Sequence, residues 1–312
     1  MAAAIHLSIS TPSPNFRAPC RTLPPLHPPM TIAKFQPLRH LSRRILRRGF
    51  SVSAAAVRQD TTLWTPAPLL KISPAAESLF NITIDVSDSP ELAGSYTKAG
   101  QYLQLRLQDP DTKPAFLAIA SPPSTAASKG VFEFLIKSAA GSTAELLCGL
   151  QKGDVVELTL AMGKGFNIDQ ISPPENYQTV VIFATGSGIR FINQALPAVI
   201  PIRSLIEAGF NADKRSNVRL YYGARSLGRM AYQERFKDWE SSGVDIVPVL
   251  SQPDDSWKGE RGYVQAAFKK EKNIISPQST GAVLCGQKQM AEEVTSLLVA
   301  DGVSTEKILK NF

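Results

Sequence analysis

The sequence predicts two domains in one chain: an antiparallel β-barrel followed by a doubly wound α/β domain built on a parallel sheet. Short runs in which polar and apolar residues alternate occupy residues 60–172, as in barrels whose strands bury one face. Over residues 177–312, continuous apolar runs alternate with helical stretches, a pattern typical of parallel strands buried on both faces. A basic leader over residues 1–55 precedes both domains.

The leader carries the net positive charge. Residues 1–58 hold nine Lys and Arg and no Asp or Glu, so 25 basic and 27 acidic residues remain for the rest of the chain. We therefore expect no nucleic-acid partner, although a disordered basic tail that binds anions remains an alternative. A leader that lacks acid and is rich in Ala, Ser, Pro and Arg is typical of an organellar transit peptide. We favour the chloroplast, either stroma or thylakoid-associated, over the mitochondrion because the first sixteen residues lack Arg.

The distribution of His and Cys excludes several kinds of site. All three histidines, His6, His27 and His40, lie in the leader. The two domains therefore contain no Ser-His-Asp triad, no Cys-His pair and no zinc site that uses His. Cys148 and Cys285 lack CxxC spacing, so we predict no metal site. No apolar run approaches the roughly 18 residues that a membrane span requires, so we expect no transmembrane segment.

The first domain is predicted from period-two alternation. Three strands stand out, with turn signals such as Ala99-Gly100 and Lys152-Gly153 between them. They cover Gln101–Leu107, Val131–Ile136 and Asp154–Leu160. One short helix is expected at 142–150.

The second domain is predicted from strand–helix alternation after the Pro173-Pro174 linker. The expected strands cover Thr179–Ala184, Val218–Tyr222, Asp245–Leu250 and Gly281–Leu284. The expected helices cover 201–208, 231–241, 263–270 and 289–300.

Two of these strands end in loops suited to a phosphate-bearing ligand. The first is followed by Thr185, Gly186, Ser187 and Gly188, where the absence of Cβ atoms lets backbone approach a pyrophosphate. The last ends in Cys285-Gly286, with Met290 in the following helix. Taken alone, the first loop is also compatible with a plain turn and Cys285 with a structural core residue.

Taken together, six segments in this order resemble the ferredoxin-NADP reductase superfamily, closest to a plant plastid branch of FAD/NAD(P)-binding oxidoreductases. In the first domain they are Gly100-Gln101-Tyr102, Ile119-Ala120-Ser121-Pro122, Gly141–Leu147 with Gly153-Asp154, and Met162–Phe166. In the second domain they are Thr185–Ile189 and Cys285–Met290.

The resemblance implies a barrel that binds FAD and an α/β domain that binds NADP(H) or NAD(H). The implied FAD-binding residues are Leu117, Ala118, Ile119, Ser121, Gly141, Ser142 and Thr143. The implied nucleotide-binding residues are Thr185, Gly186, Ser187, Gly188, Arg225, Gly286 and Met290. The resemblance also implies that Cys285 positions the nicotinamide and that Phe312 covers the flavin.

The flavin motif departs from the family pattern. Where the family has Arg, Tyr and Ser, this sequence has Ala115, Leu117 and Ala118. The missing Arg would have paired with the FAD pyrophosphate, so we expect weaker flavin retention, with Lys113 as a substitute cation. The family's NADP-selective Ser-Arg pair reads Ser251-Gln252 here, which leaves Arg225 to reach a 2′-phosphate.

A second departure is an insertion after the first glycine loop. Eleven residues, 190–200, stand where the family has one before the proline that begins the next helix, here Pro201. The insert separates the glycine loop from that helix, or begins a helix at Ile189 that Pro197 ends.

These observations favour a plastid FAD-dependent oxidoreductase that moves electrons between NAD(P)H and an unidentified acceptor, such as a small redox protein. The alternative is a catalytically impaired binding or regulatory protein of the same fold, suggested by the altered flavin motif and the insertion. A flavin-free dinucleotide dehydrogenase is weaker, because the two domains supply no His as general base.

Overall fold

The structure is a computed structural model of the whole chain, and it describes residues 62–109, 111–185, 189–191, 194–196, 199–271 and 274–311. Residues 59–312 form one compact unit that holds two six-stranded sheets. The described part therefore has the two sheets that the sequence predicts, one antiparallel and one parallel.

The first sheet is an open antiparallel barrel with strand order β4-β3-β6-β1-β2-β5. Its elements are β1 (Thr65–Ala76), β2 (Leu79–Asp85), α1 (Pro90–Ser95), β3 (Tyr102–Leu107), β4 (Ala115–Ala118), α2 (Pro123–Lys129), β5 (Val131–Lys137), α3 (Thr143–Cys148) and β6 (Val155–Leu158). The barrel is open between β4 and β5, the two edge strands. Alternation along the strands places one face of the sheet in the core. In β3, Leu103 and Leu105 are buried in the apolar core of the barrel, whereas their neighbours along the strand are only half-buried.

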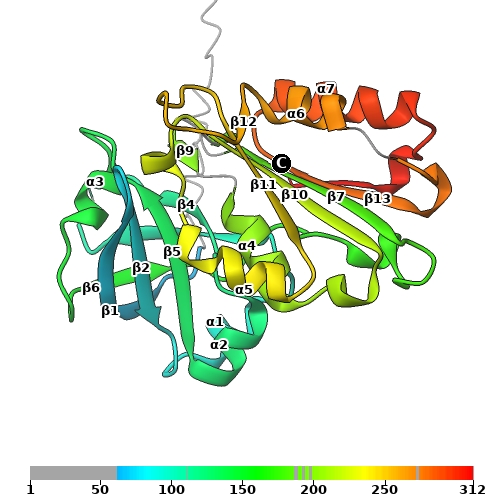
Figure 1. Cartoon of the computed structure of the whole chain (residues 1–312). Coiled ribbons are helices and arrows are strands. Elements are labelled where there is room, and N and C mark those ends of the chain that lie inside the picture. The colour runs from blue at the N-terminus through cyan, green and yellow to red at the C-terminus, as the bar shows by residue number, and fades with distance from the viewer. Residues whose placement is uncertain are drawn as a thin grey trace, which may run out of the picture. The chain divides into compact units, whose positions relative to one another are not determined.

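The second sheet is parallel, with strand order β12-β11-β10-β7-β13-β14. Its elements are β7 (Thr179–Thr185), α4 (Val199–Ala208), β10 (Asn217–Ala224), α5 (Phe236–Ser241), β11 (Asp245–Leu250), β12 (Glu260–Arg261), α6 (Val264–Glu271), β13 (Thr280–Cys285), α7 (Lys288–Ala300) and β14 (Ile308–Lys310). Helices α6 and α7 cover one face and α4 and α5 the other (Figure 1). The chain proceeds outward from β7 to β10 on one side and later to β13 on the other, so the topological switch point lies beside β7.

Burial on both faces explains the apolar runs of this sheet. In β7, Val181 and Phe183 pack with α6 and α7, whereas Val180, Ile182 and Ala184 pack with α4 and α5. Helix α7 is buried on one side only, where Met290, Val294 and Leu298 recur every four residues.

The two sheets share one apolar cluster. Barrel residues Leu79, Ala118 and Leu135 belong to the same buried cluster as Ile200 and Ile202 of α4. Helix α4 therefore lies between the sheets, and its residues 199–206 are all buried.

The segment after the first glycine loop forms strands rather than a helix. Residues Ile189–Phe191 (β8) pair antiparallel with Gln194–Leu196 (β9), so the expectation of a helix beginning at Ile189 was wrong. β-branched and aromatic residues favour an extended backbone here, and Pro197 excludes continuation of a helix. Helix α4 begins at Val199, which puts Pro201 in the first turn, where a missing N–H costs no intrahelical bond.

One predicted helix is shorter than expected. Within the segment 231–241 the α-helix begins only at Phe236. It follows a short 3₁₀ helix at Gln233–Arg235, before which Tyr232 has a left-handed backbone with φ of 64°. Sequence patterning also missed β1, β2, β4, α1 and α2. Among the described residues, no helix is long and apolar enough to cross a membrane.

Candidate functional site

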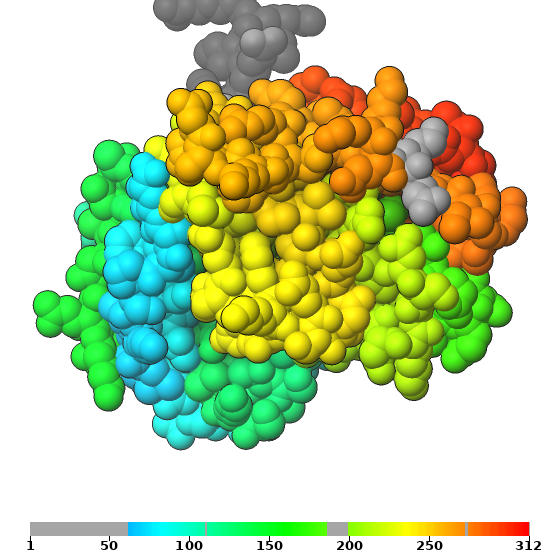
Figure 2. Space-filling model, in the orientation of Figure 1, coloured from blue at the N-terminus to red at the C-terminus, as the bar shows by residue number. Residues whose placement is uncertain are grey.

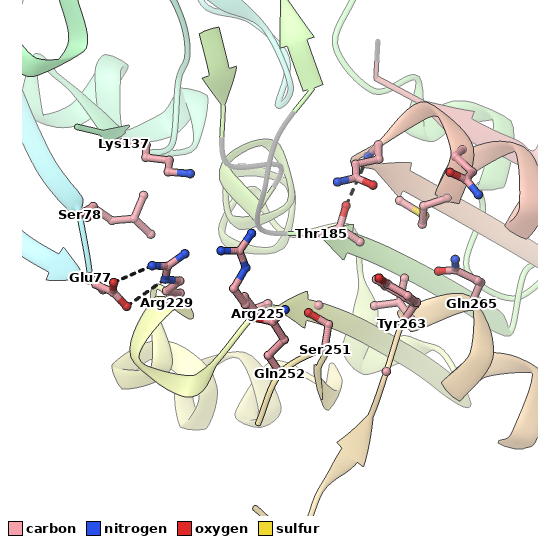
Figure 3. A pocket seen from close by; sticks show the side chains of 18 of the residues that line it. Glu77, Ser78, Lys137, Thr185, Arg225, Arg229, Ser251, Gln252, Tyr263 and Gln265 are labelled. Atoms are coloured by element: carbon pink, nitrogen blue, oxygen red, sulfur yellow. Dashed lines mark hydrogen bonds and ion pairs between the residues drawn. The ribbon is translucent and has the colours of Figure 1, made fainter. Parts of the chain in front are cut away.

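A cavity of about 610 Å³ lies at the carboxyl ends of β7, β10, β11 and β13 (Figure 3). Residues Thr185, Arg225, Ser251 and Gln287 line it from the strand ends and the loops that follow them. The β1–β2 turn and the end of β5 close it from the barrel side. Ligands of open α/β sheets bind at this edge, beside the switch point.

The two loops identified in the sequence meet at the floor of the cavity. The backbone N–H of Gln287 donates a hydrogen bond to Oγ1 of Thr185 over 3.3 Å. A Cβ on Gly286 would collide with Thr185 Oγ1 and with Met290 Cε, so only glycine lets the loops approach this closely. Gly186, Ser187 and Gly188 lie outside the described residues.

Cys285 lies beneath the cavity floor. Its side chain is completely buried in the cluster that also holds Ala184 and Val283, and it does not line the cavity. Burial raises the pKa of this thiol to about 12, so the thiol is neutral at physiological pH. Its role toward a nicotinamide stays a prediction, and Phe312 lies outside the described residues.

One end of the cavity is cationic. Arg225 and Arg229 from the β10–α5 loop and Lys137 at the end of β5 line it, together with the carboxylate of Glu77. Arg229 binds Glu77 through two hydrogen bonds, Nη2 to Oε1 over 2.7 Å and Nε to Oε2 over 2.9 Å (Figure 3). The hydrogen bond and charge of Arg229, with the charge of Arg225, lower the pKa of Glu77.

The other end is polar and carries an exposed aromatic ring. Tyr263 has 67% of its surface exposed and lies at the cavity wall with Gln265. Glu293 accepts hydrogen bonds from the amides of Gln265, over 2.8 Å, and Gln289, over 2.9 Å. An aromatic face bordered by amides suits stacking of a planar ring.

Of the predicted nucleotide-binding residues, Thr185, Arg225 and Met290 line this one cavity, and Gly286 lies directly between Thr185 and Met290. Sequence reasoning missed Glu77, Lys137, Arg229 and Tyr263. The Arg229–Glu77 pair joins residues 152 positions apart, and no local pattern reports it.

The predicted flavin-binding residues lie in two groups on the barrel. Leu117, Ala118, Ile119 and Ser121 are buried on β4 and just after it. Ser121 takes part in contacts between the sheets, since its carbonyl accepts hydrogen bonds from Tyr96 Oη over 2.8 Å and Ser204 Oγ over 3.1 Å. Because β4 is an edge strand, one side of its backbone pairs with no other strand of the sheet.

The second group surrounds the start of α3. Ser142 caps this helix by accepting the N–H of Glu145 over 3.3 Å, and Glu145 Oε2 accepts the N–H of Gly141 over 2.7 Å. Thr143 Oγ1 donates to the carbonyl of Lys113 over 2.7 Å. The backbone of the exposed Lys113 is thus held beside Thr143, and the role of its side chain as a substitute cation stays a prediction.

Strand β9 of the insertion lies against β4 and β5, at the open seam of the barrel. The insertion therefore reaches the flavin group of residues as well as separating the glycine loop from α4.

Comparisons with known proteins agree with this architecture. Residues 184–296 match a family model described as the oxidoreductase NAD-binding domain. The fruit protein pKIWI502 of Actinidia deliciosa is 48% identical over 305 residues, covering 96% of this chain and 93% of that protein.

Solved structures show the same fold at low identity. A ferredoxin NADP+ reductase of Neisseria gonorrhoeae with bound FAD and NADP superposes with a TM-score of 0.62 at 18% identity, covering 80% of this chain and 99% of that one. The CS-b5R domains of human Ncb5or in the NAD+ form give a TM-score of 0.63 at 19% identity, covering 82% and 71%.

The two sheets, with the cavity at the parallel strand ends, have the fold of these reductase structures. The chain belongs to the same family as the fruit protein pKIWI502.

Proposed function

We propose that this protein is an FAD-dependent oxidoreductase that moves electrons between NAD(P)H and a separate acceptor. The observation that carries the proposal is the meeting of Thr185 and Gly286 at the floor of one cavity with a cationic end. A volume of about 610 Å³ suits a large part of a dinucleotide, since small-molecule sites span roughly 300–1,000 Å³. The family model and the superfamily fold support the same class of ligand.

The residues around β4 and α3 fit FAD with a changed set of contacts. Lys113 with the backbone amide of Thr143 would hold the phosphates in place of the missing arginine, whereas the N–H of Ser142 already donates to the carbonyl of Ala139. The edge of β4 that faces away from β3 would bind the ring through main-chain groups such as those of Ala118, since the N–H of Ile119 already donates to the carbonyl of Gln101. Flavin binding then depends on backbone more than on side-chain charge, and we expect a weakly retained cofactor.

Bound FAD would supply hydride acceptance from reduced nicotinamide and onward electron transfer. The protein residues have positioning roles. The absence of a Cβ at Gly286 would let the ligand approach the backbone at the cavity floor, and the ring of Tyr263 would stack on a planar part of the ligand. Arg225, Arg229 and Lys137 would bind its phosphates. Cys285 stays neutral beneath the floor, where it packs under the residues that line the cavity and exchanges no proton with a ligand.

A second candidate is a binding protein of this fold without turnover. The placement of β9 against β4 and β5 favours it, because the insertion then lies where a flavin ring would need space.

One experiment separates the two. The visible spectrum of the purified protein, with and without residues 191–200, is recorded before and after anaerobic addition of NADPH or NADH. Flavin bands that bleach in both forms support the oxidoreductase. Bleaching only in the shortened form assigns the loss to the insertion, and absence of flavin from both forms supports the binding protein.

We also propose that residues 1–55 direct the protein to the chloroplast. The support is the excess of Arg, Ser and Pro without acid. Fusion of residues 1–58 to a fluorescent protein tests this, and mitochondrial or cytosolic fluorescence would contradict it.

A further inference from the structure

The ion pair between Glu77 and Arg229 has the properties of an exchangeable contact. Side-chain exposure is 53% for Glu77 and 38% for Arg229, so water and salt screen the pair. Both side chains line the cavity (Figure 3). Their two hydrogen bonds occupy Nε and Nη2 of Arg229, the two donors that could otherwise bind an anionic oxygen of a ligand.

The pair is not needed to hold the β1–β2 turn in place. The backbone N–H of Glu77 already donates to the carbonyl of Gly228 over 2.8 Å. Figure 2 shows the blue strands of this hairpin side by side with the yellow segment that contains α5, so the contact extends well beyond one side chain. The carboxylate of Glu77 is therefore free to leave without undocking the turn.

The charges around the pair favour a dianion. Lys137, Arg225 and Arg229 bring three positive charges to this end of the cavity, and Glu77 neutralises one of them. No ion pair joins Arg225 or Lys137 to another residue of the described part of the chain. A phosphate monoester that bridges Arg225 and Arg229 would place two negative charges where Glu77 offers one.

We propose that Glu77 occupies Arg229 as an internal competitor and that the 2′-phosphate of an NADP-type nucleotide displaces it. The proposal rests on the proposed nucleotide cavity. The displaced carboxylate stays in water, because more than half of it is exposed in the ion pair. Glu77 then sets how strongly the cavity discriminates between nucleotides with and without that phosphate.

The test uses two ligands that differ by one phosphate, 2′,5′-ADP and 5′-AMP, in calorimetric titrations of the full-length chain. Glu77→Gln frees Arg229 and is expected to tighten 2′,5′-ADP about fivefold, since exposed ion pairs of this kind are weak but charge-assisted phosphate contacts are stronger. Binding of 5′-AMP should change less than about twofold. Arg229→Gln should weaken 2′,5′-ADP about tenfold and leave 5′-AMP unchanged.

Asp245→Asn is the matched control. It removes a carboxylate from Arg219, a pair of similar exposure and a 2.9 Å bond that lies outside the cavity, and should leave both affinities unchanged. If Glu77→Gln folds poorly, Glu77→Asp serves instead, because its shorter carboxylate withdraws from Arg229.

Unchanged or equally tightened binding of both ligands by Glu77→Gln would overturn the exchange while leaving the nucleotide cavity intact. Failure of wild type and all variants to bind either ligand would overturn the cavity assignment as well.

Discussion

Two arginine–glutamate pairs join the barrel to the parallel sheet, and they differ mainly in burial. Arg203 of α4 binds Glu133 of β5 and, over 3.0 Å, Glu207 of its own helix, with only 4% of the arginine exposed. Arg229 binds Glu77 at the cavity in water.

The difference in burial indicates different roles for the two ion pairs. Arg203 is desolvated between the sheets and also packs over the ring of Tyr232 at 4.8 Å. Loss of its charge leaves Glu133 without an ion-pair partner among the described residues, whereas Glu207 keeps a contact with Arg235 at 3.9 Å. Beside it, Tyr96 Oη lies 2.5 Å from Ser204 Oγ, which extends the buried polar contact. Such a contact fixes the relation of the sheets, whereas the exposed pair exchanges partners.

The largest effect is expected from Arg203→Met, which keeps an apolar stem but removes the charge. Half-buried Glu133 and Glu207 lose their common partner, and we expect the free energy of unfolding to fall by about 3 kcal/mol. Urea denaturation measures this. A loss below that of an exposed pair would contradict the comparison.

Tyr96→Phe is expected to have the next largest effect. It removes the hydroxyl that donates to the carbonyl of Ser121 and contacts Ser204, at a loss of about 1–2 kcal/mol. Ser204→Ala is the control from the other side of the contact. A double mutant no less stable than either single mutant would confirm that the two hydroxyls act together.

Alkaline pH should weaken the buried region selectively. Burial raises the pKa of Tyr96 and raises that of Cys285 to about 12, so both groups ionise more readily in the unfolded chain. Their stabilising contribution is complete below the unfolded pKa values, near 9 for the thiol and 10 for the phenol, and is lost as pH rises above them. Urea midpoints at pH 8 and pH 10.5 measure the decline, and a smaller decline in Tyr96→Phe would sharpen the assignment.

The smallest effect on stability is expected from Glu77→Gln. Its wild-type carboxyl has a lowered pKa, so any contribution exists above the ordinary pKa of Glu and is lost only as pH falls through the lowered value. At pH 7 we expect the same urea midpoint as wild type within error, while nucleotide affinity changes. A clear loss of stability would show that the exposed pair holds the sheets together after all.

The order of polar and apolar residues predicts both sheets, because that order follows from which faces of each strand are buried. Alternation in 101–107 and the apolar run at 179–184 each reflect which faces are covered, and both strands formed where expected. The strand ends then located Thr185, Arg225 and Gly286 at one edge. By contrast, Glu77 and Arg229 lie in exposed turns whose sequences carry no periodic signal, and they meet only through the docking of a hairpin.

Two further differences from the predicted elements lie in backbone conformation. The delayed start of α5 depends on the left-handed Tyr232, which composition does not reveal. The pairing of β8 with β9 is the second case, because the sequence also allowed a helix that begins at Ile189.

The apolar cluster shared by both sheets has a consequence for protein engineering. Leu79 and Leu135 of the barrel and Ile202 of helix α4 would each face water if the chain were divided near residue 175. A chimera that combines one half with the matching half of a distant relative would have to recreate this cluster side chain by side chain. The barrel and the parallel-sheet half are therefore expected to evolve as one unit and to unfold in a single thermal transition.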